Sequence, residues 1–263
     1  MTRPTLHLLP YGMLDGNLTH VSQVPSGLAC GCLCPGCGAS LVAKKGKKKL
    51  HHFAHAKDAD CGSGVETALH LAAKEILEIR RVIFLPAVEV KVPGRSYSRV
   101  LDILAPEKEY SLEQVVLERR IDSIVPDVIA HIRGRAIAIE IKVSHAVDDN
   151  KATIFRGLGL SVIEIDLSKA PRTFTLEELE PLVIGPGKHK SWVFNAAALR
   201  KCEQILSGGK RRSTVYRGYA LHVDGCPIPA RVWRERPYAN FIDDCTCCGH
   251  LLDSEEGYIV CGG

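Results

Sequence analysis

Alternating apolar and polar residues predict a β-hairpin near the middle of the chain, over residues 126–142. Two apolar runs are separated by Arg133-Gly134, and Gly accepts the positive φ that a two-residue turn requires. Such a turn sets Ile132 opposite Arg135. Side chains alternate between the two faces of a strand, so the second strand is expected to have one buried apolar face. This face consists of Ile137, Ile139, Ile141 and Val143.

Helical patterns stand on both sides of the hairpin. Glu66, His70 and Lys74 are four residues apart and share one face of a predicted helix, for which Ser63 is the candidate N-cap. After the hairpin, the pattern predicts a loop, a short helix that ends at Gly157, and a further strand. A strand, a helix and a strand at this spacing predict a parallel, right-handed crossover. The expected fold class is therefore α/β.

The hairpin register also predicts where three charged side chains meet. Asp127 is expected opposite Glu140, with Cβ atoms about 5 Å apart, and Lys142 shares the face of Glu140. Two carboxylates at that distance repel each other unless a cation neutralises them. Mg²⁺ or Mn²⁺ would do so and would activate a water toward phosphorus, while the lysine offsets charge on the transition state. The alternative is a surface cluster of charges without chemistry.

The cysteines form two groups, one toward each end of the chain. There are 11 of them, and each group contains a Cys-x-x-Cys knuckle with further Cys or His at a distance typical of zinc ribbons. No signal peptide or membrane span is visible, so we expect a reducing, cytoplasmic compartment and about two structural zinc ions rather than disulfides. The N-terminal ligands are expected to be Cys34, Cys37, one of His52 and His55, and Cys61. Spacing does not settle the choice among Cys30, Cys32, His51, His52 and His55. The C-terminal ligands are expected to be Cys226, Cys245, Cys248 and Cys261.

Positive charge is unevenly distributed, although the net charge of +4 is too small to indicate a nucleic-acid partner by itself. A run of lysines beside the first knuckle could neutralise phosphates, but such runs are usually just solvated. His145 and Lys151 follow the second strand of the hairpin and could reach a phosphate, or could be ordinary loop and helix-surface residues. The lysines of the run are Lys44, Lys45, Lys47, Lys48 and Lys49.

Taken together, these motifs resemble the competence protein CoiA-like family of the PD-(D/E)xK nuclease superfamily. The resemblance runs from about residue 30 to about residue 167 and combines the knuckle, His52-Phe53-Ala54-His55, the helix of Glu66, Pro126-Asp127 and Glu140-Ile141-Lys142. It implies a restriction-endonuclease-like core, with a mixed central sheet flanked by helices and small zinc-binding modules at both ends. It also implies that Glu66 adds an acid to the metal site. The implied activity is metal-dependent hydrolysis of DNA, in transformation or in conflict with phages and mobile elements.

Three domains are expected from the breaks in the pattern. Residues 1–62 would form an N-terminal arm and zinc-binding module, residues 63–190 the nuclease core, and residues 191–263 a helix, a basic linker and a zinc ribbon. Further helices are predicted over 175–184 and 192–206. Cys202 is expected to be a buried thiol in the second of these.

We expect the partner to be DNA and expect no association with a membrane. A homo-oligomer, or a protein partner bound through the zinc modules, is also possible under this interpretation. The predicted strand after the crossover carries Glu164 and Asp166 between apolar residues, so both are expected to form only its polar face. Two alternatives to an enzyme remain. One is a nucleic-acid-binding zinc protein with a degenerate core, and the other is an adaptor that binds a protein through its zinc ribbons.

Overall fold

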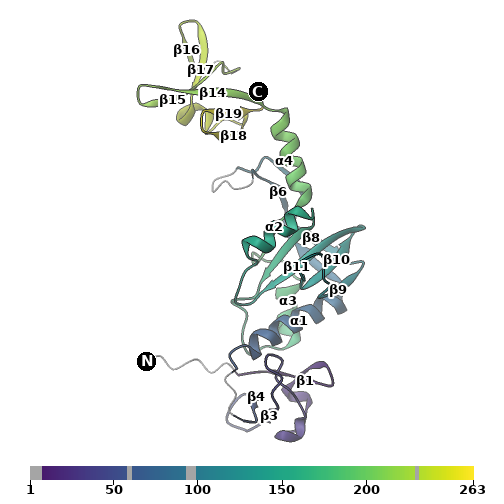
Figure 1. Cartoon of the computed structure of the whole chain (residues 1–263). Coiled ribbons are helices and arrows are strands. Elements are labelled where there is room, and N and C mark those ends of the chain that lie inside the picture. Colours follow the sequence, from purple (N-terminus) through teal and green to yellow (C-terminus); the bar gives the residue numbers. More distant parts are fainter. Residues whose placement is uncertain (1–7, 58–60, 93–98, 229–230) are drawn as a thin grey trace. The chain divides into compact units, whose positions relative to one another are not determined.

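The structure is a computed structural model that describes residues 8–57, 61–92, 99–228 and 231–263. It is a mixed α/β protein with many short strands and few helices (Figure 1). The chain forms two compact units, the first made of residues 1–86 and 107–195 and the second of residues 87–106 and 196–263. The three domains expected from the sequence are a different division and remain a prediction.

The first unit is built on a mixed five-stranded sheet in the order β13-β12-β11-β10-β9. The predicted hairpin is confirmed, with Ile132 opposite Arg135, and Arg133 and Gly134 have φ of 50° and 72°. Both values are positive, as a type I′ turn requires. The predicted parallel crossover is also confirmed, because β12 pairs in parallel with β11. The strands are β9 (Val115–Leu117), β10 (Val128–Ile132), β11 (Arg135–Lys142), β12 (Ser161–Asp166) and β13 (Lys190–Phe194).

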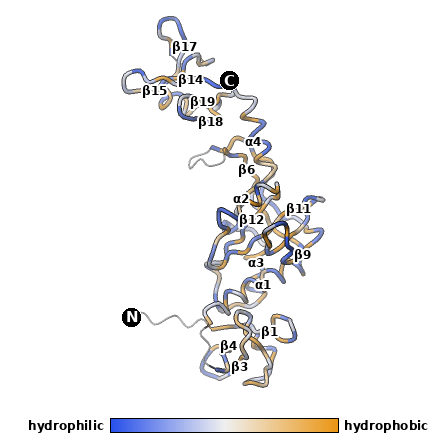
Figure 2. The backbone as a smooth tube through the Cα atoms, viewed as in Figure 1, coloured by the Kyte–Doolittle hydropathy of each residue, from blue (hydrophilic) through white to orange (hydrophobic). Residues whose placement is uncertain are grey.

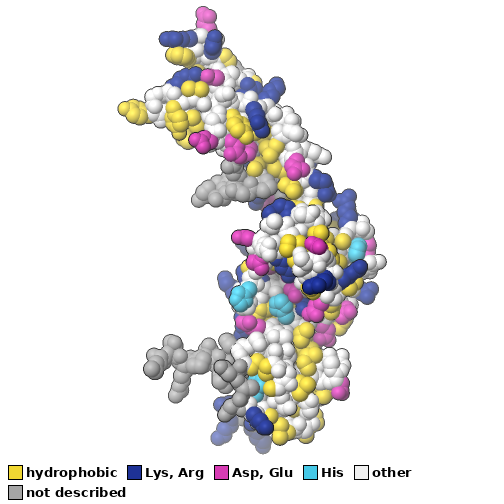
Figure 3. Space-filling view, viewed as in Figure 1, with side chains coloured by type: hydrophobic (Ala, Val, Ile, Leu, Met, Phe, Trp, Pro, Cys, Tyr) yellow, Lys and Arg dark blue, Asp and Glu magenta, His cyan; other side chains and the backbone are white. Residues whose placement is uncertain are grey.

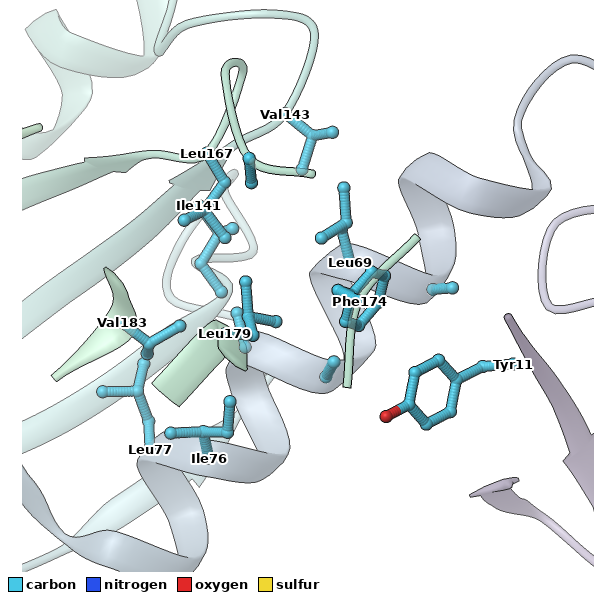
Figure 4. Packing of buried hydrophobic residues seen from close by; sticks show 14 of the residues in the cluster. Tyr11, Leu69, Ile76, Leu77, Ile141, Val143, Leu167, Phe174, Leu179 and Val183 are labelled. Carbon is cyan, nitrogen blue, oxygen red and sulfur yellow. The ribbon is translucent and has the colours of Figure 1, made fainter. Parts of the chain in front are cut away.

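Helices α1 (Gly64–Arg80) and α3 (Leu176–Val183) bury their apolar faces in the same core as one face of this sheet. Figure 4 shows Leu69, Leu77 and Leu179 of the helices in the same buried cluster as Ile141 of the sheet. The predicted apolar face of β11 is therefore confirmed. The third helix, α2 (Asp149–Gly157), packs against β12 and β13.

One local prediction is confirmed only in part and another is wrong. Ser63 is the N-cap residue of α1, as predicted, but its side chain makes no capping hydrogen bond, because its φ of −96° and ψ of −8° are already helical, whereas a capping residue is usually extended. The helix predicted over 192–206 begins only at Ala196, since Trp192 belongs to β13 and pairs with Ile163 of β12. Cys202 is buried in this helix, α4 (Ala196–Gly208), as predicted.

Short hairpins at the N-terminus share the hydrophobic core of the first unit. Tyr11 stacks on Phe174 with ring centres 5.0 Å apart, and both belong to the cluster that contains α1 and the central sheet (Figure 4). The N-terminal segment therefore packs on the core instead of standing alone. Its strands are β1 (Tyr11–Leu14), β2 (Asn17–His20), β3 (Leu41–Lys44) and β4 (His52–His55), and β5 (Val82–Leu85) pairs with β8 (Lys108–Ser111) later in the unit.

The second unit combines α4 and the pair β6 (Val88–Val90) and β7 (Asp102–Ala105) with a six-stranded antiparallel sheet. Its order is β16-β17-β15-β14-β19-β18. The strands of this sheet are β14 (Lys210–Arg217), β15 (Ala220–Asp224), β16 (Arg231–Trp233), β17 (Arg236–Asn240), β18 (Leu251–Glu255) and β19 (Tyr258–Cys261).

Hydrophilic and hydrophobic positions are interspersed along the elements of both units (Figure 2). Among the described residues, no helix combines the length and the apolar character that crossing a bilayer requires.

Candidate functional site

A polar cleft of about 340 Å³ opens where β11 ends and the loop toward α2 begins. It contains Asp127, Glu140 and Lys142, the three residues that the hairpin was predicted to bring together. Asp127 directly precedes β10, and the register of the hairpin continued by one residue sets it opposite Glu140. His145 and Lys151 also line this cleft. The other described residues that line it are His70, Ile141, Val143, Ser144, Ala146, Val147, Asp148 and Glu164.

Asp127 is a partly buried carboxylate that is held in its ionised form. Its Oδ2 accepts a hydrogen bond of 2.8 Å from the backbone N–H of Ile141, and its Oδ1 lies 3.3 Å from Lys74 Nζ and 3.6 Å from His70 Nδ1. Burial alone would raise the pKa of Asp127, but these hydrogen bonds and positive charges outweigh it and lower the pKa to about 2. Asp127 therefore carries its negative charge throughout the neutral range.

Glu140 is in the opposite situation. Its side chain is buried, and burial raises its pKa to about 7, with Lys151 lowering it and the charge of Asp127 raising it further. Glu140 Oε2 accepts a hydrogen bond of 2.7 Å from Lys151 Nζ, but Oε1 is buried without a hydrogen-bond partner among the described residues. A buried, unsatisfied carboxylate oxygen is unfavourable. An oxygen-seeking divalent cation beside Asp127 would satisfy it, so these two residues fit such an ion.

Lys142 lies in the cleft but is paired with the next strand. The parallel register sets Glu140 beside Glu164 and Lys142 beside Asp166. Lys142 Nζ is 2.7 Å from an oxygen of Asp166 and 3.9 Å from one of Glu164. Glu164 is itself buried, and its Oε2 accepts a hydrogen bond of 2.8 Å from the N–H of Val147.

The sequence interpretation missed this role of Glu164, which it assigned to a plain polar strand face. The predicted alternation of apolar and polar residues is correct, but the polar face of β12 lines the cleft through Glu164. Glu164-Ile165-Asp166 repeats the spacing of Glu140-Ile141-Lys142 on a strand predicted to be its parallel neighbour. This repeated spacing was the signal that could have identified Glu164.

Helix α1 contributes His70 to the lining of the cleft, and its Lys74 contacts Asp127. Lys74 is 6% exposed and bridges Asp127 and Glu118, whose Oε1 lies 2.7 Å from Lys74 Nζ. Glu66 lies in the first turn of α1 and is not among the described residues that line the cleft. Its role as an additional metal ligand stays a prediction.

A second group of metal-ligating side chains lies in the N-terminal segment. Cys34, Cys37, His55 and Cys61 place their ligand atoms within 4.8 Å of one another. Cys34 Sγ lies 3.7 Å from Cys61 Sγ, and Cys37 Sγ lies 3.4 Å from His55 Nε2. Three thiolates and an imidazole are a common ligand set of structural zinc sites. This group could hold a zinc ion.

The structure distinguishes the two candidate histidines. His52 and His55 are three residues apart on β4, so their side chains leave opposite faces of the strand. His52 Nδ1 lies 2.8 Å from the carbonyl oxygen of Leu50, and only His55 reaches the three cysteines. Cys30 and Cys32 are buried thiols whose sulfurs contact backbone carbonyls.

The cysteine knuckle is pressed against the N-terminus of α1. A Cβ added to Gly36 would lie 2.7 Å from Ser63 Oγ, and one added to Gly64 would lie 3.1 Å from Cys34 Sγ. Both contacts are shorter than ordinary Cβ contacts, so a larger residue at either position would have to displace a neighbouring atom. The first residue of the helix that carries His70 and Lys74 thus touches a candidate zinc ligand.

The four C-terminal cysteines are less closely grouped than the N-terminal ligand candidates. Cys226, Cys245, Cys248 and Cys261 line one small cavity of about 20 Å³, and burial, with the neighbouring thiols, raises the pKa of Cys245 to about 11. Within the described part of the chain, the 4.8 Å spacing is met by the N-terminal group and not by this one. The C-terminal zinc site stays a prediction.

The lysine run beside the knuckle is mostly exposed. Lys45 differs from the others, since its Nζ donates hydrogen bonds to the carbonyls of Ser22 and Val24 and so fastens β3 to the preceding loop. The exposed members are Lys44, Lys47, Lys48 and Lys49.

Comparison with known proteins bears on the N-terminal segment. Residues 29–64 match the model of the family described as competence protein CoiA, N-terminal domain. The matched segment contains the four residues of the candidate zinc site and ends at the first residue of α1, before the acidic cleft. No curated protein and no solved structure matches the chain.

We expect His55→Ala to remove one zinc ion per chain, whereas His52→Ala should leave the zinc content unchanged. The loss should also lower the free energy of unfolding by several kcal/mol, because a structural zinc ion contributes its binding energy to folding. Elemental analysis and urea denaturation of the purified variants measure both effects. Equal zinc content in the two variants would contradict the assignment of His55.

Stability should fall as the pH rises through the range in which Glu140 titrates. The pKa of Glu140 is about 7 in the folded chain against an ordinary value of 4.5. As the pH rises, the unfolded chain therefore loses this proton at a lower pH than the folded chain does. The stabilisation that protonated Glu140 contributes below about pH 4.5 is lost by about pH 7, which lowers the free energy of unfolding by roughly 3 kcal/mol.

The matched variant is Glu140→Gln, which does not titrate. Without added Mg²⁺ or Mn²⁺, urea denaturation at about pH 5 and about pH 8 should show a larger loss of stability in the parent than in Glu140→Gln. Parallel pH dependence of the two proteins would show that Glu140 does not titrate in this range.

Proposed function

We propose that this protein is a Mg²⁺- or Mn²⁺-dependent nuclease that hydrolyses phosphodiester bonds in DNA and has a PD-(D/E)xK-type core. The observation that carries the proposal is the unpaired buried oxygen of Glu140 next to the ionised carboxylate of Asp127. A purely structural cluster has no need of an unsatisfied acceptor in the cleft. Strongly perturbed carboxyl groups in a cleft are typical of functional sites.

Asp127 and Glu140 would hold the divalent ion, and Glu164 stands beside Glu140 on the neighbouring strand as a further oxygen donor. When bound, such an ion polarises a phosphoryl oxygen and makes water a better nucleophile at neutral pH. A bound cation would favour the ionised form of Glu140, whose pKa is raised by burial. Lys74 and His70 keep Asp127 ionised in readiness for it.

The lysines of the cleft have separate tasks. Lys142 is directed by Asp166, and we infer that its ammonium orients the attacking water and offsets charge that develops on the phosphate. Lys151 is paired with Glu140, so metal binding would free this ammonium to contact the substrate. His145 lines the same cleft and is a candidate phosphate contact.

The setting of the reaction is inferred from the N-terminal segment. The similarity to the N-terminal domain of the competence protein CoiA supports a role in DNA uptake or processing. Zinc at Cys34, Cys37, His55 and Cys61 would then be structural, because all four ligand positions are filled by the chain.

We also propose a second structural zinc ion at the C-terminal cysteines. Four free thiols around one small cavity, without a disulfide among them, are typical of a closed Cys₄ site. The sheet that carries them has a small core of its own, made of Val223, Ala239, Cys245, Ile259 and Cys261. A zinc ion would stabilise a unit with so little apolar contact.

Purified protein should cleave linear, circular or single-stranded DNA when Mg²⁺ or Mn²⁺ is added. Glu140→Gln and Lys142→Ala should each reduce the cleavage rate by roughly 100-fold or more, because each removes an interaction with charge that develops in the reaction. Glu109→Gln, which changes an exposed acid of β8 outside the cleft, should retain the parental rate.

Gel analysis of the products measures these rates on zinc-loaded, folded protein. Absence of cleavage by the parent on every substrate would count against the nuclease and would favour the binding protein or adaptor considered above.

Replacement of Cys248 by Ser should reduce the zinc content by one ion per chain. The matched control is Cys247→Ser, since Cys247 is the exposed neighbour outside the cavity. Elemental analysis should find about two zinc ions in the parent and in Cys247→Ser, and about one in Cys248→Ser. An unchanged zinc content in Cys248→Ser would refute the C-terminal site.

A further inference from the structure

The six-stranded sheet of the second unit has one open face rich in arginine and aromatic side chains. Asp224 of β15 is opposite Tyr238 of β17, and Trp233 of β16 is opposite Arg236 of β17. Residues two apart on a strand share a face, so these pairs belong to a single surface. This surface, called the Arg–Trp face below, consists of Arg217, His222, Asp224, Trp233, Arg236 and Tyr238.

The two sides of the sheet differ sharply. Val223 and Ala239, which alternate with the residues of the Arg–Trp face, are buried in the small core with Cys245, Ile259 and Cys261. The Arg–Trp face instead lines a hollow of about 550 Å³, and Trp233 is 50% exposed. An exposed tryptophan is not explained by the packing of this sheet.

The aromatic side chains of this face are held in place by charged neighbours. Arg217 makes two hydrogen bonds of 2.7 Å to the carboxylate of Asp224, and its guanidinium lies 5.5 Å from the ring centre of Trp233. The guanidinium of Arg234 lies 4.5 Å from the same ring. His222 and Tyr238 meet edge to face at 5.1 Å. The rings are thus positioned and remain accessible.

Positive charge is concentrated in the same segment. Residues 210–238 contain seven Lys or Arg and two Asp or Glu, a net charge of +5, whereas the whole chain has +4. In the space-filling view, Lys and Arg side chains lie beside hydrophobic ones over the β16–β17 hairpin (Figure 3). The ligand of this face is therefore expected to be an anion with flat apolar surfaces.

We propose that the Arg–Trp face binds single-stranded DNA, with unpaired bases stacked on Trp233 and Tyr238 and phosphates contacted by arginines such as Arg236. Stacking on exposed rings in a basic groove is how proteins hold single strands, and it needs bases that are not already stacked inside a duplex. The choice of DNA over RNA rests on the proposed nuclease function, while the preference for a single strand follows from the face itself.

The test is fluorescence anisotropy with a labelled oligothymidine of about 20 nucleotides, without added Mg²⁺ or Mn²⁺ so that no cleavage occurs. Trp233→Ala should weaken binding roughly 5- to 100-fold, which is the range for loss of one base stack. Trp233→Phe should retain most of the affinity. Arg236→Gln should reduce the dependence of the affinity on salt by about one phosphate contact.

The matched control is Tyr216→Ala. Tyr216 is 75% exposed on β14, but it alternates with Arg217 and so lies on the other side of the sheet. Its replacement should leave binding unchanged. Zinc content and circular dichroism establish that each variant is folded.

Several outcomes would overturn the proposal. They are unchanged affinity in Trp233→Ala, equal losses in Trp233→Ala and Tyr216→Ala, tighter binding of duplex DNA, and equal or tighter binding of an RNA oligonucleotide of the same length. Glu109→Gln, which changes an exposed acid of β8 outside the cleft, should bind the oligonucleotide as the parent does. Binding without cleavage by the parent would refute only the nuclease, and cleavage without dependence of binding on Trp233 would refute only this face.

Discussion

Repulsion between two neighbouring acidic side chains, the partly buried Asp127 and the buried Glu140, is the constraint on which the candidate site depends. The turn at Arg133 and Gly134 fixes the hairpin register, and the register brings these acids together. The structure offsets the repulsion from two sides, with Lys74 of α1 next to Asp127 and Lys151 of α2 next to Glu140. Each helix thus supplies one lysine to the pair, and Glu140 Oε1 is still left without a hydrogen-bond partner among the described residues.

The N-terminal segment contacts the helix that carries Lys74. Helix α1 supplies Lys74, and its first residue, Gly64, touches Cys34 of the candidate zinc site. Cys61, another residue of that site, precedes α1 by three positions, so a zinc ion there would fix where the helix begins. Metal binding in the N-terminal segment and charge balance in the cleft are thus linked through one helix, although the two sites use different ligand chemistry.

The sequence predicted the features that depend on short-range patterns. A Gly in the turn and an apolar alternation were sufficient for the hairpin, its buried face and its acidic pair. Glu164 was missed because alternation identifies a polar face but does not show what closes over it. Trp192 was misassigned because an apolar run fits a helix or an edge strand, and only pairing with β12 decides between them. The β16–β17 hairpin lacked a glycine signal, since its turn uses Arg234 and Glu235 at positive φ.

The net charge of the cleft limits its ability to attract a negatively charged substrate. Its lining includes four acids and two lysines, Asp127, Glu140, Asp148, Glu164, Lys142 and Lys151. One divalent cation would bring this set to neutrality, which permits a phosphate to enter but does not attract a polyanion over distance. For the proposed nuclease, affinity for DNA would then come from charge elsewhere on the chain. The exposed lysines beside the knuckle and the basic segment 210–238 are where the sequence concentrates it, so binding and hydrolysis are expected to reside on different surfaces.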